Sequence, residues 1–151
     1  MPNHLAKILL FFPLASVILG CGSDSQRPDG LPPLLPMTIT VVQAGVPLTD
    51  AVVTLTPDSG PTRWGSGGYS NAQGKVAVKT HGNFPGAPAG KYKVTVLKRE
   101  REGEGEGNVT EYYLVDPVYE SAETTPFRVD VGSGSKEAKF DVGESIRLKI
   151  E

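Results

Sequence analysis

From residue 37 onward, apolar and polar residues alternate with a period of two, and this pattern limits the possible folds more than any other feature. Successive side chains of a strand point to opposite faces, so such alternation is typical of a sheet with one buried face. Gly, Pro, Asn and Asp separate the alternating segments, and no window after residue 21 has a helical period. The seven segments are 37–41, 51–56, 75–79, 91–96, 127–131, 138–142 and 146–151. They predict an all-β chain with one seven-stranded sandwich over residues 37–151.

The first twenty residues have the organisation of an export signal. Lys7 and the amino terminus are positive, and residues 8–19 are almost wholly apolar. That run is shorter than the ~18 residues needed to span a bilayer, so residues 1–20 are predicted to be a signal peptide. Residues 18–21 read I-L-G-C and resemble a bacterial lipobox. The resemblance implies that Cys21 receives a diacylglyceryl group and becomes the first mature residue; an ordinary signal peptide with an incidental cysteine is the alternative.

Residues 21–36 combine this cysteine with a Pro-rich and Gly-containing run, which predicts a tether without regular structure. An extended tether of this length reaches about 45 Å at ~3.1 Å per residue. Two acyl chains on Cys21 give stable attachment, whereas one holds a protein only marginally. The expected location is the periplasmic or outer face of a membrane. Gly22 follows the cysteine. By resemblance to enterobacterial sorting rules, Asp at this position would retain a lipoprotein in the inner membrane, so Gly22 favours the outer membrane.

Four segments downstream resemble the carboxypeptidase-regulatory-like domains, which have a transthyretin-like (prealbumin-like) sandwich. Residues 45–57 read G-V-P-L-T-D-A-V-V-T-L-T-P, and residues 71–76 read N-A-Q-G-K-V. Residues 86–96 read G-A-P-A-G-K-Y-K-V-T-V, and residues 119–127 read Y-E-S-A-E-T-T-P-F, as in small lipoproteins of planctomycete-type bacteria. The resemblance covers residues 37–150 and implies that fold. The matched residues serve folding: Gly74 and Gly90 suit turns that need positive φ, and Tyr92 lies on an apolar strand face.

No set of residues predicts catalysis, a metal site or a cofactor. His81 is the only histidine after the signal, and zinc sites and Ser-His-Asp triads need more ligands or partners than it can supply. The enzymes known on transthyretin-like folds require several histidines. A net charge of −2, without a basic patch, also argues against nucleic acid as a partner. The chain is therefore predicted not to be an enzyme.

Two features are candidates for contact with a ligand. Trp64 and Tyr69 flank a Gly-Ser-Gly-Gly turn, which predicts either an aromatic platform for a sugar or a pair of rings that closes the sandwich. Residues 99–107 are rich in Glu and Gly, which favours a solvated hairpin loop over a calcium site. The sequence thus indicates a non-enzymatic, membrane-anchored module of the cell envelope that binds another envelope protein or a polysaccharide. A carbohydrate-binding module using Trp64 and Tyr69 is the alternative.

Overall fold

The computed structural model describes residues 26–59, 63–103, 109–132 and 134–151. In these ranges the chain is all-β, which confirms the predicted fold class, and a single 3₁₀ turn, η1 (Pro117–Tyr119), is the sole helical element. The signal peptide and Cys21 lie outside the described residues. No helix in the described ranges is long and apolar enough to cross a membrane.

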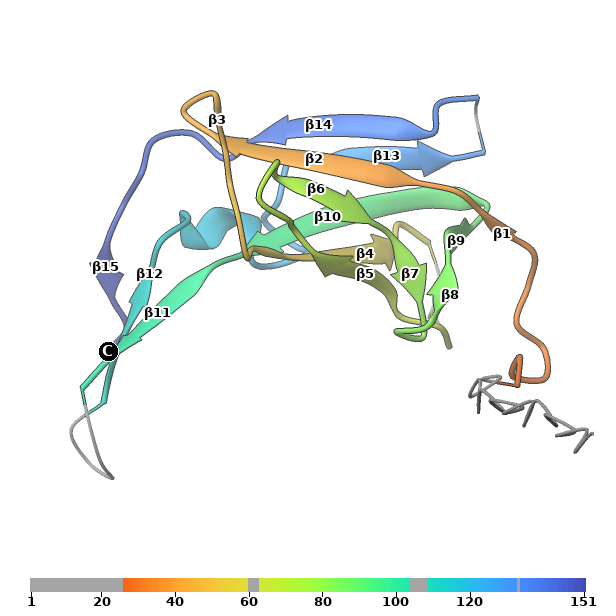
Figure 1. The fold of residues 1–151 in the computed structure, drawn as a ribbon, viewed down its shortest axis with the longest axis horizontal. Coiled ribbons are helices and arrows are strands. Elements are labelled where there is room, and N and C mark those ends of the chain that lie inside the picture. The colour runs from red at the N-terminus through yellow and green to blue at the C-terminus, as the bar shows by residue number, and fades with distance from the viewer. Residues whose placement is uncertain (1–25, 60–62, 104–108, 133) are drawn as a thin grey trace, which may run out of the picture.

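Two sheets form the body of the molecule. The six-stranded sheet has the order β13 (Arg128–Val131), β10 (Gly90–Leu97), β4 (Val52–Pro57), β5 (Ser66–Tyr69), β7 (Lys79–Thr80) and β8 (Phe84–Pro85). The other contains β14 (Glu137–Asp141), β2 (Thr38–Gln43) and β3 (Val46–Pro47), and β6 (Lys75–Ala77) also pairs with β2. Strands pair antiparallel except β14 with β2, which are parallel. Figure 1 shows β14 and β2 lying over β10 and β4, so the body is sandwich-like.

Two smaller sheets extend this body. β1 (Leu34–Leu35) pairs with β9 (Ala87–Pro88) beside the N-terminal segment. β11 (Arg99–Glu102), β12 (Thr110–Tyr113) and β15 (Leu148–Lys149) form a three-stranded sheet that we call the arm. β11 continues the course of β10 away from the body in Figure 1. The arm therefore projects from the end of the molecule opposite β1.

The core lies between the two large sheets and is mainly aliphatic. Alternate residues of β2, β4 and β10 are buried, as period-two patterning requires. Ile39 and Val41 of β2 belong to one continuous cluster with Val53 and Leu55 of β4. Partly buried rings complete it, because Phe127 stacks on Tyr119 and Phe140 with centroid separations of 4.8 and 4.7 Å. The predicted apolar-in, polar-out pattern is thus confirmed for these strands.

The strands agree only in part with the seven predicted segments. Six segments correspond to β2, β4, β6 with β7, β10, β13 and β14. The seventh, residues 146–151, forms the two-residue β15, which pairs with β12 in the arm and not with the sandwich. Its side chains are mostly exposed, so alternation alone did not reveal which sheet it joins. The structure also contains strands that the pattern did not predict, among them β5, β11 and β12.

The described part of the predicted tether is packed against the body. Leu31 is only 7% exposed, and β1 pairs with β9 in register Leu34 to Pro88. Gly86, with φ of 97°, allows this approach, because a Cβ there would lie 2.4 Å from the carbonyl oxygen of Leu35. The packed region therefore begins before the predicted boundary at residue 37. The reason is that Leu31 buries apolar surface and that the backbone of Leu34 and Leu35 pairs with β9.

Candidate functional site

The Gly-Ser-Gly-Gly segment is not a turn, and this changes the predicted site. Ser66–Tyr69 forms β5, which pairs with β4 on one side and β7 on the other. Gly67 must be glycine, because a Cβ there would lie 2.2 Å from the carbonyl oxygen of Val53. Ser66 Oγ lies 2.8 Å from Thr80 Oγ1, whose hydroxyl donates to the carbonyl oxygen of Gly86 at 2.7 Å. These buried hydrogen bonds hold β5 within the sheet.

Residues of four neighbouring strands border a hollow of about 650 Å³, which we call the β5 groove because Ser66–Tyr69 all line it. Gly67 stands between Thr54 and Lys79 in the register, so the row of side chains is interrupted there. Tyr69 is opposite Val52 at the end of β5 and is 76% exposed. The groove is lined by residues of β4, β5, β6 and β7, among them Val52, Thr54, Gly67, Tyr69, Lys75 and Lys79.

The charge of the β5 groove is positive. Lys75 and Lys79 both line it and are exposed, and no described residue that lines it is acidic. Neither lysine has an ion-pair partner within the described residues. Asn71 shapes one end, because its Oδ1 accepts hydrogen bonds from the backbone N–H groups of Gln73 and Lys75, both at 2.9 Å. A protein of net charge −2 thus presents two lysines in one groove without an ion pair to any residue that the structure describes.

The structure does not bring Trp64 and Tyr69 together. Trp64 precedes β5 and lines a different, smaller hollow of about 470 Å³, whereas Tyr69 ends the strand. The Arg63 guanidinium lies 5.0 Å from the centre of the Trp64 ring, and His81 meets the same ring edge-on at 5.7 Å. The two predicted residues therefore form no shared aromatic platform, since β5 separates them.

Gly74 and Tyr92 behave as predicted, whereas Gly90 has the predicted positive φ but lies in strand β10 and not in a turn. Gly74 has φ of 71° in the turn before β6, and Gly90 has φ of 152° at the start of β10. The Tyr92 hydroxyl donates to the carbonyl oxygen of Pro88 at 2.8 Å, and burial raises the pKa of this phenol. Within the described residues, no group of three or more His, Cys, Asp or Glu side chains is placed to hold a metal ion.

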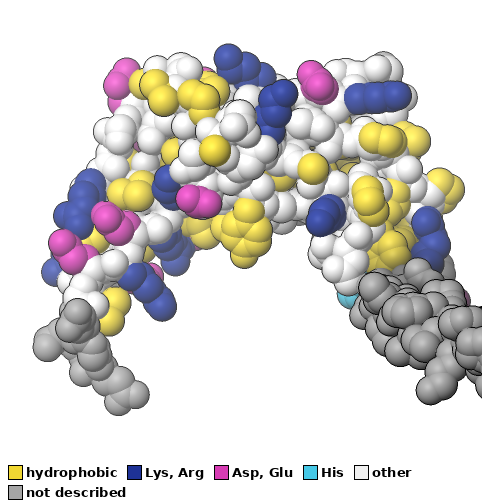
Figure 2. Space-filling model, viewed as in Figure 1, with side chains coloured by type: hydrophobic (Ala, Val, Ile, Leu, Met, Phe, Trp, Pro, Cys, Tyr) yellow, Lys and Arg dark blue, Asp and Glu magenta, His cyan; other side chains and the backbone are white. Residues whose placement is uncertain are grey.

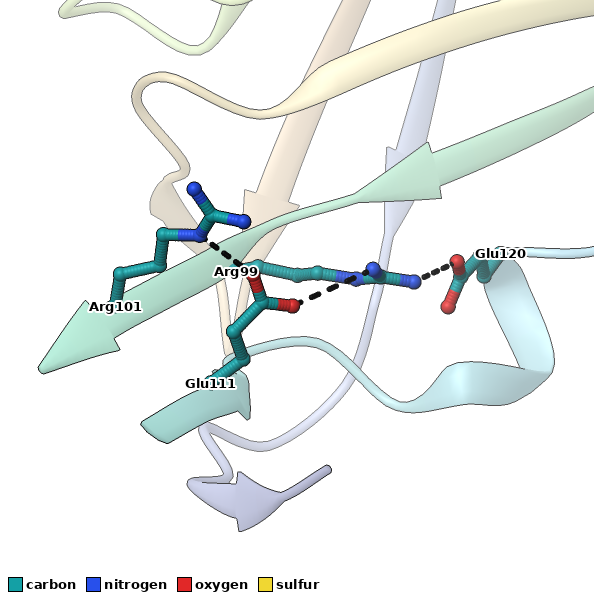
Figure 3. A network of polar contacts seen from close by, with 4 residues as sticks. All are labelled: Arg99, Arg101, Glu111 and Glu120. Carbon is teal, nitrogen blue, oxygen red and sulfur yellow. Dashed lines mark hydrogen bonds and ion pairs between the residues drawn. The ribbon is translucent and has the colours of Figure 1, made fainter. Parts of the chain in front are cut away.

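The predicted loop over residues 99–107 is partly a strand held by charge pairs. On one face of β11, Arg99 pairs with Glu120 and Glu111, and Arg101 Nε lies 2.5 Å from Glu111 Oε1 (Figure 3). On the other face, Arg147 reaches Glu100 at 3.1 Å and Glu102 at 2.8 Å.

Arg147 also organises an aromatic side chain and a carboxylate of the arm. Its guanidinium lies 3.6 Å from the centre of the Tyr112 ring. Its hydrogen bond and charge lower the pKa of the Glu102 carboxyl. Arg147 thus forms ion pairs with both Glu100 and Glu102. Residues 104–108 of the predicted loop lie outside the described residues.

Comparisons with family models, with curated proteins and with solved structures find no match to this chain. The β5 groove is therefore interpreted from its own lining residues and charge.

Proposed function

We propose that this chain is an exported lipoprotein, anchored to a membrane through Cys21, that presents a non-enzymatic β-sandwich binding module at the periplasmic or outer face. The observation that carries the proposal is the sequence I-L-G-C directly after an apolar run of signal-peptide length. It puts the single cysteine of the chain at the one position where lipidation needs it. Gly22 favours the outer membrane over the inner one.

The packed N-terminal segment makes this anchor a short one. Leu31 is only 7% exposed and β1 pairs with β9, so residues 22–30 are the available spacer. Even when fully extended, a segment of this length spans at most roughly 30 Å, at ~3.3–3.6 Å per residue. The module would therefore act close to the lipid surface, and the end that carries β1 would face it.

A transthyretin-like topology is the finer fold assignment within this proposal. It is supported by the order of the four motif segments and by the positive φ of Gly74 and Gly90. An experimental structure superposed on a transthyretin-like domain would test it. A strand order that cannot be matched would limit the assignment to a sandwich-like all-β fold.

Lipid labelling in cells tests the anchor. The wild type and the Cys21→Ala variant are expressed with a clickable palmitate analogue, with Ser23→Ala as the matched neighbour control. We expect label and membrane association for the wild type and Ser23→Ala, and neither for Cys21→Ala. Label on all three proteins, or on none of them, would overturn the anchor.

Carbohydrate binding is a second candidate function that one observation favours. Tyr69 exposes most of its ring beside an open groove, although Trp64 does not share that groove. An aromatic ring presents a flat apolar surface together with a polar edge, which suits the face of a sugar ring. The envelope partner of the module would then be a polysaccharide.

A further inference from the structure

We infer that the β5 groove binds an acidic polysaccharide, with Tyr69 packed against a sugar ring and Lys75 and Lys79 in contact with its carboxylate or sulfate groups. This inference rests on the proposed binding function and names its ligand class. Four features of the groove support it: its paired strands, its backbone floor, its exposed ring and its two lysines without ion-pair partners in the described residues.

The paired strands argue against a peptide as the occupant. Peptides that bind to sheets commonly add a strand to an open edge, through main-chain hydrogen bonds. β5 offers little of such an edge, because β4 pairs with all four of its residues and β7 pairs with Ser66 and Gly67. A ligand in the groove is therefore held mainly by side chains and by the surface of the backbone.

The floor and the ring suit a sugar. Gly67 and Gly68 both line the groove, so backbone forms part of its floor and a flat ring meets few side chains there. Val52 and Thr54 border this floor on β4, and Tyr69 stands at its end with 76% of its surface exposed. The phenol offers an apolar face for the C–H groups of a sugar and a hydroxyl for hydrogen bonds.

The lysines select an acidic polymer. Lys75, Ala77 and Lys79 are alternate exposed residues of one run of chain, and the small Ala77 leaves space between the two ammonium groups. At ~3.3 Å per residue their Cα atoms are at most about 13 Å apart. Two charges at this spacing match anionic groups that repeat along a chain better than one small anion.

Binding of labelled oligosaccharides to the full chain in detergent tests the inference. Fluorescence anisotropy is measured with fluorescein-labelled oligogalacturonate, with labelled cellohexaose as the neutral sugar and with labelled poly-glutamate as the acidic peptide. The variants are Tyr69→Ala, Tyr69→Phe and the double change Lys75→Gln with Lys79→Gln. The matched control is Lys136→Gln with Lys149→Gln, two exposed lysines outside the groove without an ion pair in the described residues.

We expect the wild type to bind oligogalacturonate in preference to the other two probes. Because charge-assisted contacts are the stronger ones, the double groove variant should lose roughly tenfold or more in affinity, and Tyr69→Ala roughly fivefold. Tyr69→Phe and the control pair should stay within about twofold of the wild type. Thermal unfolding midpoints close to that of the wild type show that the variants are folded.

Several outcomes would overturn the inference. Absence of oligogalacturonate binding, or binding that the groove variants do not weaken, removes the groove as the site. Equal affinity for poly-glutamate would assign the groove to acidic proteins, and equal affinity for cellohexaose would make the lysines irrelevant. Cys21→Ala is measured in parallel. If this variant loses the lipid label but still binds sugar, the anchor and the groove act independently. If the wild type carries the lipid label but binds no sugar, the inference about the groove is refuted and the proposed anchor is not.

Discussion

The body and the arm of this molecule are both β-sheet, but different forces hold them together. In the body, side chains such as Ile39, Val53 and Val94 are completely buried. In the arm, all four residues of β11 are exposed and none of β12 or β15 is buried. Figure 2 shows the same contrast on one face, where acidic and basic side chains gather on the arm.

The contrast shows how a strand can form with or without a core. Burying one aliphatic side chain in the body contributes about 1.5–3 kcal/mol. Exposed ion pairs contribute much less, because water and salt screen them. The arm has several ion pairs in place of a core. Arg99 and Arg101 pair across strands with Glu111, and Arg147, just before β15, pairs with Glu102. The Leu114 N–H also donates to the carbonyl oxygen of Lys98 at 2.9 Å. The body should therefore respond to loss of volume, and the arm to loss of charge.

The largest effect is expected from a cavity in the core. Ile39→Ala removes three carbon atoms from a side chain that is completely buried. We expect the free energy of unfolding to fall by about 2–5 kcal/mol. Urea unfolding followed by circular dichroism measures this loss.

Leu148→Ala in the arm is the matched control, because Leu148 is among the exposed large hydrophobic residues. Its substitution should change stability by at most about 0.5 kcal/mol. Equal losses in the two variants would refute the contrast between body and arm.

The next largest effect concerns a buried polar pair in the body. Thr80→Val keeps the volume but leaves Ser66 Oγ and the carbonyl oxygen of Gly86 without their partner. We expect a loss of about 1–3 kcal/mol in urea unfolding, since unsatisfied buried polar groups are costly. Thr54→Val, at an exposed position of β4, is the control. If Thr80→Val were as stable as the wild type, the hydrogen bonds would not be what holds β5 against β7.

Prediction from sequence succeeded where burial fixes the pattern. Alternating aliphatic residues identified β2, β4, β10, β13 and β14, because each of these strands has one face on the core. β11 was missed because its sequence, Arg-Glu-Arg-Glu, has no apolar side and forms a strand only through its partners. β1 was missed because prolines concealed leucines that pack on the body.

The candidate site was predictable only in part. Tyr69 was found as an aromatic residue beside glycines, but β5 itself has no alternation and is fixed by backbone pairing with β4 and β7. Lys75 and Lys79 appeared as ordinary outward-facing residues of a strand. Their place in one groove depends on which strands become neighbours, and a local pattern carries no information on that.

A smaller effect is expected from the charges of the arm. Arg147→Gln removes the ion pairs to Glu100 and Glu102 and weakens the contact with the Tyr112 ring. We expect almost no change in the unfolding midpoint, but faster amide hydrogen exchange in β12 and β15. Added salt should speed exchange there in the wild type and have little effect in β4 and β10. Lys136→Gln, outside the arm, is the control. Unchanged exchange in the arm of Arg147→Gln would mean that backbone pairing alone holds it.

The smallest effect is a shift in the pKa of one carboxyl group in the arm. This shift distinguishes the effect of charge from the effect of packing most directly. The hydrogen bond and positive charge of Arg147 hold the pKa of Glu102 below its ordinary value of 4.5. Because the folded pKa is lowered, the Glu102 carboxylate stabilises the arm above the ordinary pKa of glutamate, and this is lost as the pH falls through the lowered pKa. In Arg147→Gln the pKa of Glu102, followed by carbon-13 NMR of its carboxyl group, should rise toward its ordinary value. Arg99→Gln should leave it unchanged, since Arg99 pairs with Glu111 and Glu120 on the other face of β11. If Arg99→Gln raised the Glu102 pKa by the same amount, Glu102 would be responding to the total positive charge of the arm and not to its partner Arg147. The claim that specific ion pairs distinguish the arm from the body would then be refuted.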